Sequence, residues 1–252
     1  STRFAVVYKD HVKQSLDAPE LLPDVVILDP DVLACLPAYP RTCAAFDAMC
    51  QAIESWWSPR ATEESRSYAK EAIRLMMPVF KRYLDGSSDT FPTMIKAANL
   101  AGRAIDITRT TAPHAMSYAL TMRCGIAHGH AVTLLLPYVW EYMAERVNTQ
   151  KETGLAGTFS EIADALFACG VSEAVERLKE LNDRYGMCAP QGVRHVDFGN
   201  LTASVIEARL NNNPVPLTPE VIANIYRKAL TCGTSVSSYQ PVTGPGGSRR
   251  TI

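Results

Sequence analysis

The segment TRTTAPHAMSYALTMRCGIAHGHAVTLLLPY spans residues 108–138 and holds three of the five histidines in this 252-residue chain. They are His114, His128 and His130. Proline suits the first turn of a helix, so Pro113 predicts a helix that begins just before His114. A break at Gly125 predicts a second helix from His128, and two adjacent helices can aim His114 and His128 at one point. The alternative is a pair of ordinary core histidines.

A second polar pair lies upstream, inside a segment whose apolar periodicity predicts an amphipathic helix over 44–57. Asp47 and Gln51 are four residues apart, so a helix puts both on one face. An aspartate on the apolar side of a helix is costly unless a cation or hydrogen bonds compensate. One carboxylate and two imidazoles from separate helices suit a divalent metal with room for a substrate oxygen. The alternative is a solvated or capping aspartate.

Composition narrows the class of protein. The chain is 47% hydrophobic with a formal net charge of -1, which argues for a substantial core and against nucleic acid or a membrane surface as a partner. Its longest apolar run, 131–140, is too short to span a bilayer. Seven cysteines without CxxC spacing favour reduced thiols in a cytoplasm.

The segments predict a mainly α fold. Two valine-rich runs, 3–8 and 24–29, predict strands at the edge of a larger sheet or in a small ribbon packed on helices. The sequence between Pro37 and the tail predicts helices joined by turns. The tail, from Tyr239 onward, is expected to be disordered. The expected helices cover 44–57, 62–84, 93–108, 113 onward, 128–146 with a kink at Pro137, 159–168, 172–185, 201–210 and 218–229.

Other side chains near the histidines are candidates for substrate chemistry. Tyr118 follows His114 by four residues, so it shares that helix face and either relays a proton or fills core beside the site. His130 is two residues beyond His128 and therefore faces another way, which makes it a poorer metal ligand. Tyr118 and His130 both stay candidates for a catalytic role.

Arginine offers a planar fork for carboxylate or phosphate oxygens, and several arginines flank the histidines in sequence. Arg109, with Thr110 and Thr111, comes just before the first histidine helix and is the leading candidate to grip an anionic substrate. Its alternative is a structural salt bridge with Asp106. Arg123 is the reserve candidate.

Three segments of the chain resemble the iron-containing (group III) alcohol dehydrogenase family. DAMCQAIESWWS resembles that family's D-A-x-x-H-A-I-E-x-(Y/W) segment. APHAMSYALTMRCGIAHGHAVTLLLPYV resembles V-H-A-M-A-H-x-L-G…P-H-G-x-A…L-L-P-x-V, with the same fourteen-residue spacing between its metal histidines. NNNPVPLTPEVIANIYRKAL resembles the N-P-R-x-x-T…I-Y-x-x-A stretch near the family's C-terminus. Together the three segments cover most of the chain.

The resemblance implies a dehydroquinate synthase-like helical domain that holds Fe²⁺ or Zn²⁺. Residues 1–37 would be an overhang of a preceding dinucleotide-binding domain, 38–238 the metal-binding domain and 239–252 a flexible tail. The implied metal ligands are Asp47, His114 and His128, with Gln51 standing where the family has another histidine.

The implied reaction is NAD(P)H-linked reduction of a small aldehyde, with the alkoxide protonated through Tyr118, His130 or water. Where the family tends to have small glycines, this chain has Arg109, Thr110 and Thr111, which resembles the phosphonoacetaldehyde reductase branch. That branch makes 2-hydroxyethylphosphonate. A homodimer is expected as well.

Alternatives of other classes stay open at this point. One is a non-catalytic metal-binding or dimerisation module that kept the helical fold, and another is an alcohol dehydrogenase for an uncharged substrate. Because the site for the nicotinamide's pyrophosphate would lie upstream, the 252-residue chain alone is expected to fold without turning over substrate. The choices between NADH and NADPH, and between iron and zinc, are left open.

Overall fold

Helix α1, Ala38–Trp57, is the helix around which the others are arranged, and it packs against α2, α4 and α6. Its predicted apolar positions are all buried, among them Phe46, Met49 and Ile53, none of which has any exposed surface. Burying each such side chain stabilises the fold by roughly 1.5–3 kcal/mol. Burial also extends around most of the helix, as expected for a helix at the centre of a bundle.

The computed structural model describes residues 2–9, 12–190, 193 and 196–231. The predicted disorder of 239–252 lies outside these residues. The remaining α-helices are α2 (Glu63–Met76), α3 (Phe80–Leu84), α4 (Phe91–Thr108), α5 (Ala112–Cys124), α6 (His128–Gln150), α7 (Thr153–Ala165), α8 (Val171–Arg184), α9 (Phe198–Ala203), α10 (Glu207–Leu210) and α11 (Pro219–Thr231). The described residues also include the short 3₁₀ helices η1 (Pro19–Leu21), η2 (Pro30–Cys35) and η3 (Ser88–Thr90).

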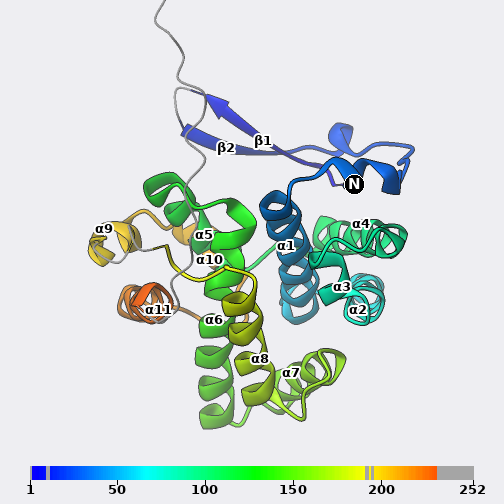
Figure 1. The fold of residues 1–252 in the computed structure, drawn as a ribbon. Helices are drawn as coiled ribbons and strands as arrows, with labels where there is room; N and C mark the ends of the chain where they lie inside the picture. Colours follow the sequence, from blue (N-terminus) through cyan, green and yellow to red (C-terminus); the bar gives the residue numbers. More distant parts are fainter. Residues whose placement is uncertain (1, 10–11, 191–192, 194–195, 232–252) are drawn as a thin grey trace, which may run out of the picture.

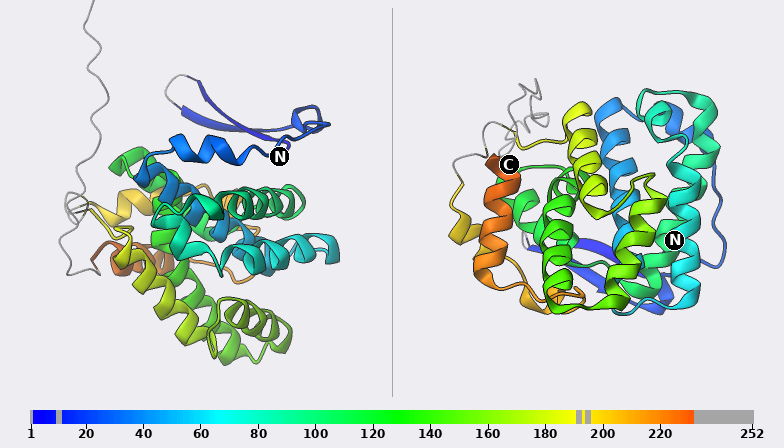
Figure 2. Two further views of the ribbon diagram at one scale, coloured as in Figure 1. Left: turned by 45° about the vertical axis from the view of Figure 1, so that its right-hand side comes forward. Right: turned by 90° about the horizontal axis from the view of Figure 1, so that it is seen from below.

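A two-stranded antiparallel ribbon lies across one end of the helices (Figure 1). It consists of β1 (Phe4–Lys9) and β2 (Val12–Asp17), with Phe4 opposite Asp17. Figure 2 shows the ribbon on one side of the helical body, while α7 and α8 extend on the other. The mainly α fold with a small N-terminal β element is therefore confirmed. The assignment of 1–37 to a preceding domain stays a prediction.

The predicted strand at 24–29 is wrong. That segment is extended but unpaired with any other strand in the described part of the chain, and Val25 and Ile27 are 78% and 87% exposed. Its valine-rich composition suits a strand, but a strand needs a neighbour to accept its hydrogen bonds. The more polar segment 12–17 forms β2 instead, because it can fold back on β1.

Two predicted helices are each divided in the structure. The segment 62–84 becomes α2 and α3, because Pro78 cannot continue the helical hydrogen-bond ladder. The segment 201–210 becomes α9 and α10, and Ser204 ends α9 with its hydroxyl donating to the Asn200 carbonyl. By contrast, α6 continues through Pro137 as one helix. No helix among the described residues is both long enough and apolar enough to cross a membrane.

Candidate metal centre and substrate pocket

Three side chains from three helices meet at one corner of the molecule. Asp47 comes from the middle of α1, His114 from the first turn of α5 and His128 from the first residue of α6. The Asp47 Oδ1 atom lies 3.4 Å from Nε2 of His114 and 3.8 Å from Nε2 of His128. One donor atom from each residue lies within 4.8 Å of the others. These three residues are called the metal corner below.

A glycine allows the helices of the metal corner to approach each other. A Cβ atom at Gly129 would lie 2.1 Å from the Cys43 carbonyl oxygen and 3.0 Å from the Cβ of Asp47. Only glycine therefore lets the start of α6 lie against α1 at this distance. The contact places the neighbouring His128 beside Asp47. Gly125, the predicted break between the two histidine helices, ends α5 in a left-handed conformation with φ +66°.

The buried carboxylate of Glu54 orients His114 from behind. Its Oε1 atom lies 2.6 Å from Nδ1 of His114, and its Oε2 atom accepts hydrogen bonds from the amide and hydroxyl of Thr111 at 2.6 and 2.9 Å. A carboxylate accepts, so Nδ1 of His114 carries the proton and Nε2 is directed toward Asp47. Within the described residues, His114 Nε2 makes no hydrogen bond although it is buried.

His128 is oriented in the same way. The Ser117 hydroxyl donates to the His114 carbonyl at 2.7 Å, so its oxygen accepts from Nδ1 of His128 at 3.2 Å. That leaves Nε2 of His128 facing Asp47. Both imidazoles thus have Nδ1 anchored on the protein and Nε2 aimed at one point, which is the usual arrangement of metal-bound histidines.

The electrostatics of the metal corner suit a cation. Burial lowers the pKa of His114, but the neighbouring carboxylates of Glu54 and Asp47 outweigh it and raise this pKa from 6.5 to about 10. Two carboxylates therefore hold a positive charge at His114, and a metal ion would take the place of its proton. A carboxylate and two neutral imidazoles are a donor set for Fe²⁺ or Zn²⁺. The residues present fit such an ion.

Gln51 lies beside the metal corner, one turn after Asp47. Its side-chain amide donates to Oδ2 of Asp47 at 2.7 Å, which holds the carboxylate in place. Neutral amides are weak donors to a transition metal compared with imidazole. A supporting role for Gln51, with weak ligation at best, stays a prediction.

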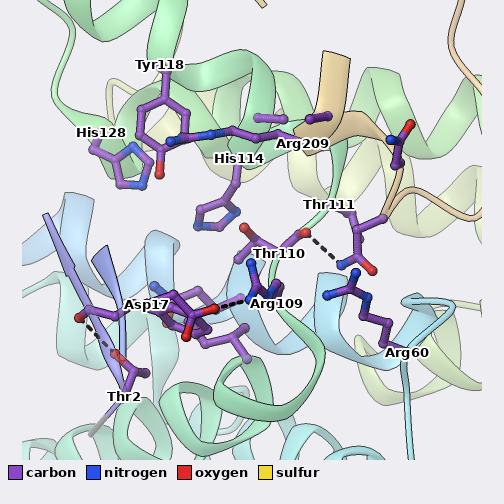
Figure 3. A pocket seen from close by; sticks show the side chains of 17 residues that line it. Thr2, Asp17, Arg60, Arg109, Thr110, Thr111, His114, Tyr118, His128 and Arg209 are labelled. Carbon is purple, nitrogen blue, oxygen red and sulfur yellow. Dashed lines mark hydrogen bonds and ion pairs between the residues drawn. The ribbon is translucent and has the colours of Figure 1, made fainter. Parts of the chain in front are cut away.

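A pocket of about 510 Å³ opens next to the metal corner (Figure 3). His114, His128, Tyr118 and Gln51 line one side of it. The Tyr118 ring lies 5.5 Å from the His128 ring, and the guanidinium of Arg209 lies 4.3 Å above the Tyr118 ring. The other lining residues are Thr2, Phe4, Asp17, Arg60, Ile105, Arg109, Thr110, Thr111, Ala115, Ala208, Asn211 and Asn212.

His130 does not share the position predicted for a proton relay. Its Nε2 atom lies 3.0 Å from the Cys188 carbonyl and its Nδ1 atom 3.0 Å from the Tyr39 hydroxyl. A carbonyl only accepts, so Nε2 donates to it and Nδ1 accepts from Tyr39. Burial lowers the pKa of His130 despite those backbone carbonyls. It is a neutral core histidine that does not line the pocket, because two residues along α6 turn it to another face.

The predicted anion-binding residues Arg109, Thr110 and Thr111 differ in their contacts within the protein. Arg109 lines the pocket, but its guanidinium is ion-paired with Asp17, so the salt-bridge alternative holds with a partner other than Asp106. The Thr111 hydroxyl donates to Glu54 and accepts from the Trp57 indole at 3.0 Å, which leaves it no donor for a substrate. Thr110 lines the pocket, and its role in substrate binding stays a prediction.

Arg123, the reserve candidate, lies elsewhere. Its Nε atom donates to the Ser204 hydroxyl at 2.8 Å, and the residue does not line the pocket. A position one turn beyond Tyr118 on α5 reaches α9 rather than the substrate side. We therefore assign Arg123 no substrate contact.

Sequence reasoning missed three functional candidates, namely Glu54, Arg60 and Arg209. Glu54 stands inside the quoted segment 47–58, three residues after Gln51, and a fully buried glutamate on an apolar helix face was a detectable signal. Nothing local marks Arg60 or Arg209, because each enters the pocket only through the packing of distant segments.

Comparison with known proteins agrees with this geometry. Residues 42–230 match the Fe-containing alcohol dehydrogenase family, C-terminal. A protein from Streptomyces viridochromogenes named phosphonoacetaldehyde reductase is 31% identical over 246 residues, covering 92% of this chain and 62% of that protein. Long-chain-alcohol dehydrogenase 1 from Geobacillus thermodenitrificans is 26% identical over 251 residues, covering 95% of this chain and 62% of its own length.

A solved structure gives the same result. The iron-containing alcohol dehydrogenase from Thermococcus thioreducens superposes with a TM-score of 0.79 at 27% identity, over 92% of this chain and 61% of that one. The chain thus spans about three fifths of the length of these relatives. By the family match over most of its length and the shared helical fold, the chain belongs to the iron-containing alcohol dehydrogenase family and corresponds to its C-terminal part.

Proposed function

We propose that this chain is the metal-binding part of an NAD(P)H-linked aldehyde reductase, and that its substrate is phosphonoacetaldehyde, which it reduces to 2-hydroxyethylphosphonate. The observation that carries the proposal is the convergence of Asp47, His114 and His128 beside a pocket that is also lined by arginines. The relative from Streptomyces viridochromogenes, named phosphonoacetaldehyde reductase, supports the finer assignment.

The metal corner would bind the divalent ion that the proposed reaction needs. Asp47, His114 and His128 would hold the divalent ion, which when bound supplies Lewis-acid polarisation of the aldehyde, while NAD(P)H supplies hydride. Glu54 and Ser117 keep the two imidazoles turned so that Nε2 of each faces Asp47. Because both anchors hydrogen-bond the rings directly, little reorganisation is needed when the ion enters.

Tyr118 is the proposed proton donor to the product oxygen. It lines the pocket next to His128, with its ring 5.5 Å from that imidazole ring and 4.3 Å from the Arg209 guanidinium. With His130 turned away, Tyr118 or a water molecule beside it would supply the proton.

The test uses the full-length natural protein with its metal content measured by elemental analysis. NADH and NADPH oxidation is followed with phosphonoacetaldehyde and with propanal as an uncharged aldehyde of similar size. We expect kcat/KM to favour phosphonoacetaldehyde by at least about 100-fold, because a site built for a polar group rejects analogues that lack it. The Asp47→Asn variant should lose both the ion and turnover.

Two results would contradict the proposal in different ways. Bound metal without reduction of any aldehyde would favour a non-catalytic metal-binding module. Equal kcat/KM for propanal and phosphonoacetaldehyde would support an aldehyde reductase but contradict a phosphonate substrate. That result would favour an alcohol dehydrogenase for uncharged substrates.

A further inference from the structure

Three arginines line the pocket, and they differ in whether the guanidinium forms an ion pair within the protein. Arg109 is ion-paired with Asp17, and the same carboxylate also binds Arg3 at 2.9 Å. Asp17 is the one carboxylate among the described residues that line the pocket. Arg60 and Arg209 make no ion pair with any carboxylate in the described part of the chain. Two positive charges in the pocket are therefore left without an internal counter-charge.

Arg209 contacts Tyr118, the aromatic residue that lies beside the metal ligand candidate His128. It lies on α10, which packs against α5, and its guanidinium stacks over the Tyr118 ring at 4.3 Å. The Tyr118 ring also lies 5.5 Å from the His128 ring, so Arg209 and the metal corner share Tyr118 as a neighbour. Stacking uses the face of a guanidinium and leaves its N–H donors, which lie in the plane, available to an acceptor. Figure 3 shows the side chain reaching across Tyr118 on the His128 side of the pocket.

Arg60 approaches the pocket from another segment, just after the end of α1. Its backbone amide donates to the Ser58 hydroxyl at 3.2 Å, which fixes the turn that carries it. Figure 3 shows its side chain below Thr111, away from Tyr118. The residue is exposed, so its charge faces the open side of the pocket. We call Arg60 and Arg209 together the arginine wall.

We propose that the arginine wall binds the charged end of the substrate, with Arg209 as the main contact, Arg60 at the rim, and Arg109 committed to Asp17. This rests on the proposed function and names the residues that select its substrate. The ligand class is an aldehyde with a tetrahedral oxyanion on the carbon next to the carbonyl. A phosphonate dianion matches two unpaired cations better than a sulfonate monoanion does. In so short a molecule the anion must sit close to the metal-bound end, which favours Arg209 over Arg60.

The test compares Arg209→Met, Arg60→Met and Arg209→Lys in the metal-loaded, full-length protein. Arg209→Met should lower kcat/KM for phosphonoacetaldehyde at least about 30-fold, since it removes a charge-assisted contact from a half-buried site. Propanal should change less than about 3-fold. Arg60→Met, at the exposed rim, should cost about 5-fold or less. Arg209→Lys should recover part of the loss, because it restores the charge without the planar fork.

Arg146→Met is the matched control. Arg146 is exposed on α6, about 27 Å along the helix from His128 at 1.5 Å per residue, and should leave every parameter unchanged. Calorimetric binding of methylphosphonate to the same proteins separates this inference from the proposed function, because it needs no turnover. Suppose that the wild-type protein reduces no aldehyde but binds methylphosphonate, and that Arg209→Met does not bind methylphosphonate. That result would contradict the proposed function and support anion binding by the arginine wall.

Three results would overturn the inference. Equal losses for propanal and phosphonoacetaldehyde in Arg209→Met would make Arg209 a structural partner of Tyr118. Weaker NAD(P)H binding with unchanged methylphosphonate binding would assign the arginines to the cofactor's phosphates. Tighter binding of methylsulfonate than of methylphosphonate would replace the phosphonate with a sulfonate as the recognised group.

Discussion

The metal corner and the arginine wall border the same pocket but are held in different ways. Each imidazole of the metal corner is hydrogen-bonded from behind, by a fully buried Glu54 or by Ser117, and all three residues stand on long helices. Arg209 stands on the four-residue helix α10 and is held by stacking, while Arg60 is exposed after the end of α1. The reactive end of a substrate thus meets a rigid surface, and its variable end meets an adjustable one.

This difference has a physical reason. A metal ion demands donor atoms placed within a few tenths of an ångström, which only side chains locked by packing can supply. A long arginine can reach an anion from a range of positions, and its strength comes from charge rather than from exact placement. Substrate preference can therefore change at the arginine wall without disturbing the metal corner.

The largest effect is expected for His128→Ala. Removing one of three donors should weaken divalent-metal binding by more than about 100-fold, beyond the 10–100-fold typical when a residue behind a ligand is changed. Gln51→Ala should weaken it far less, because the amide supports Asp47 rather than the ion. Metal titration of both variants checks this. Loss of binding in Gln51→Ala alone would show that the ligand assignment is wrong.

Glu54→Gln should weaken metal binding by about 10–100-fold. The amide keeps the size of the side chain but replaces one acceptor with a donor, which then faces either Thr111 or Nδ1 of His114. The matched control is Glu141→Gln, a partly exposed carboxylate on α6 that pairs with Lys179 and Lys228. Titration with the same ion compares the two. An equal affinity in both variants would mean that the metal corner does not depend on its buried support.

Gly129→Ala should destabilise the fold by roughly 1–3 kcal/mol. The added methyl group would collide with the Cys43 carbonyl of α1, so α6 must move away and carry His128 with it. Chemical denaturation measures the free energy of unfolding. The control is Gly157→Ala on α7, where a methyl group meets nothing within 4 Å. A Gly129→Ala variant as stable as Gly157→Ala would show that the helices can separate without cost.

Asp17→Asn should have the smallest effect, at most about 1 kcal/mol in the free energy of unfolding, because its ion pairs with Arg3 and Arg109 are partly exposed. The same variant frees Arg109 toward the pocket, so phosphonate affinity should stay equal or rise slightly. Calorimetry with methylphosphonate shows whether the affinity rises, falls or stays the same in Asp17→Asn. A large fall in affinity would place Asp17 in the binding site and undo the division between Arg109 and the arginine wall.

The amino-acid sequence predicted the helical class from its own patterns and, through its resemblance to known segments, the family and the three residues that converge at the metal corner. Helix periodicity placed Asp47 and Gln51 on one face, and the spacing of His114 and His128 matched two adjacent helices, because both patterns are local and a helix repeats every 3.6 residues. Pro113 and Gly125 marked helix ends for equally local reasons.

The tertiary structure alone decided which partners the polar groups have. Glu54 and His114 are 60 residues apart and Arg109 and Asp17 are 92 apart, and such pairs form only when distant segments pack together. The same packing turned His130 to the Tyr39 side, joined β2 to β1 in place of 24–29, and brought Arg209 over Tyr118. A local pattern can say that a side chain carries charge, but only the folded chain sets which charge or ring it meets, because contact energies depend on distance in space.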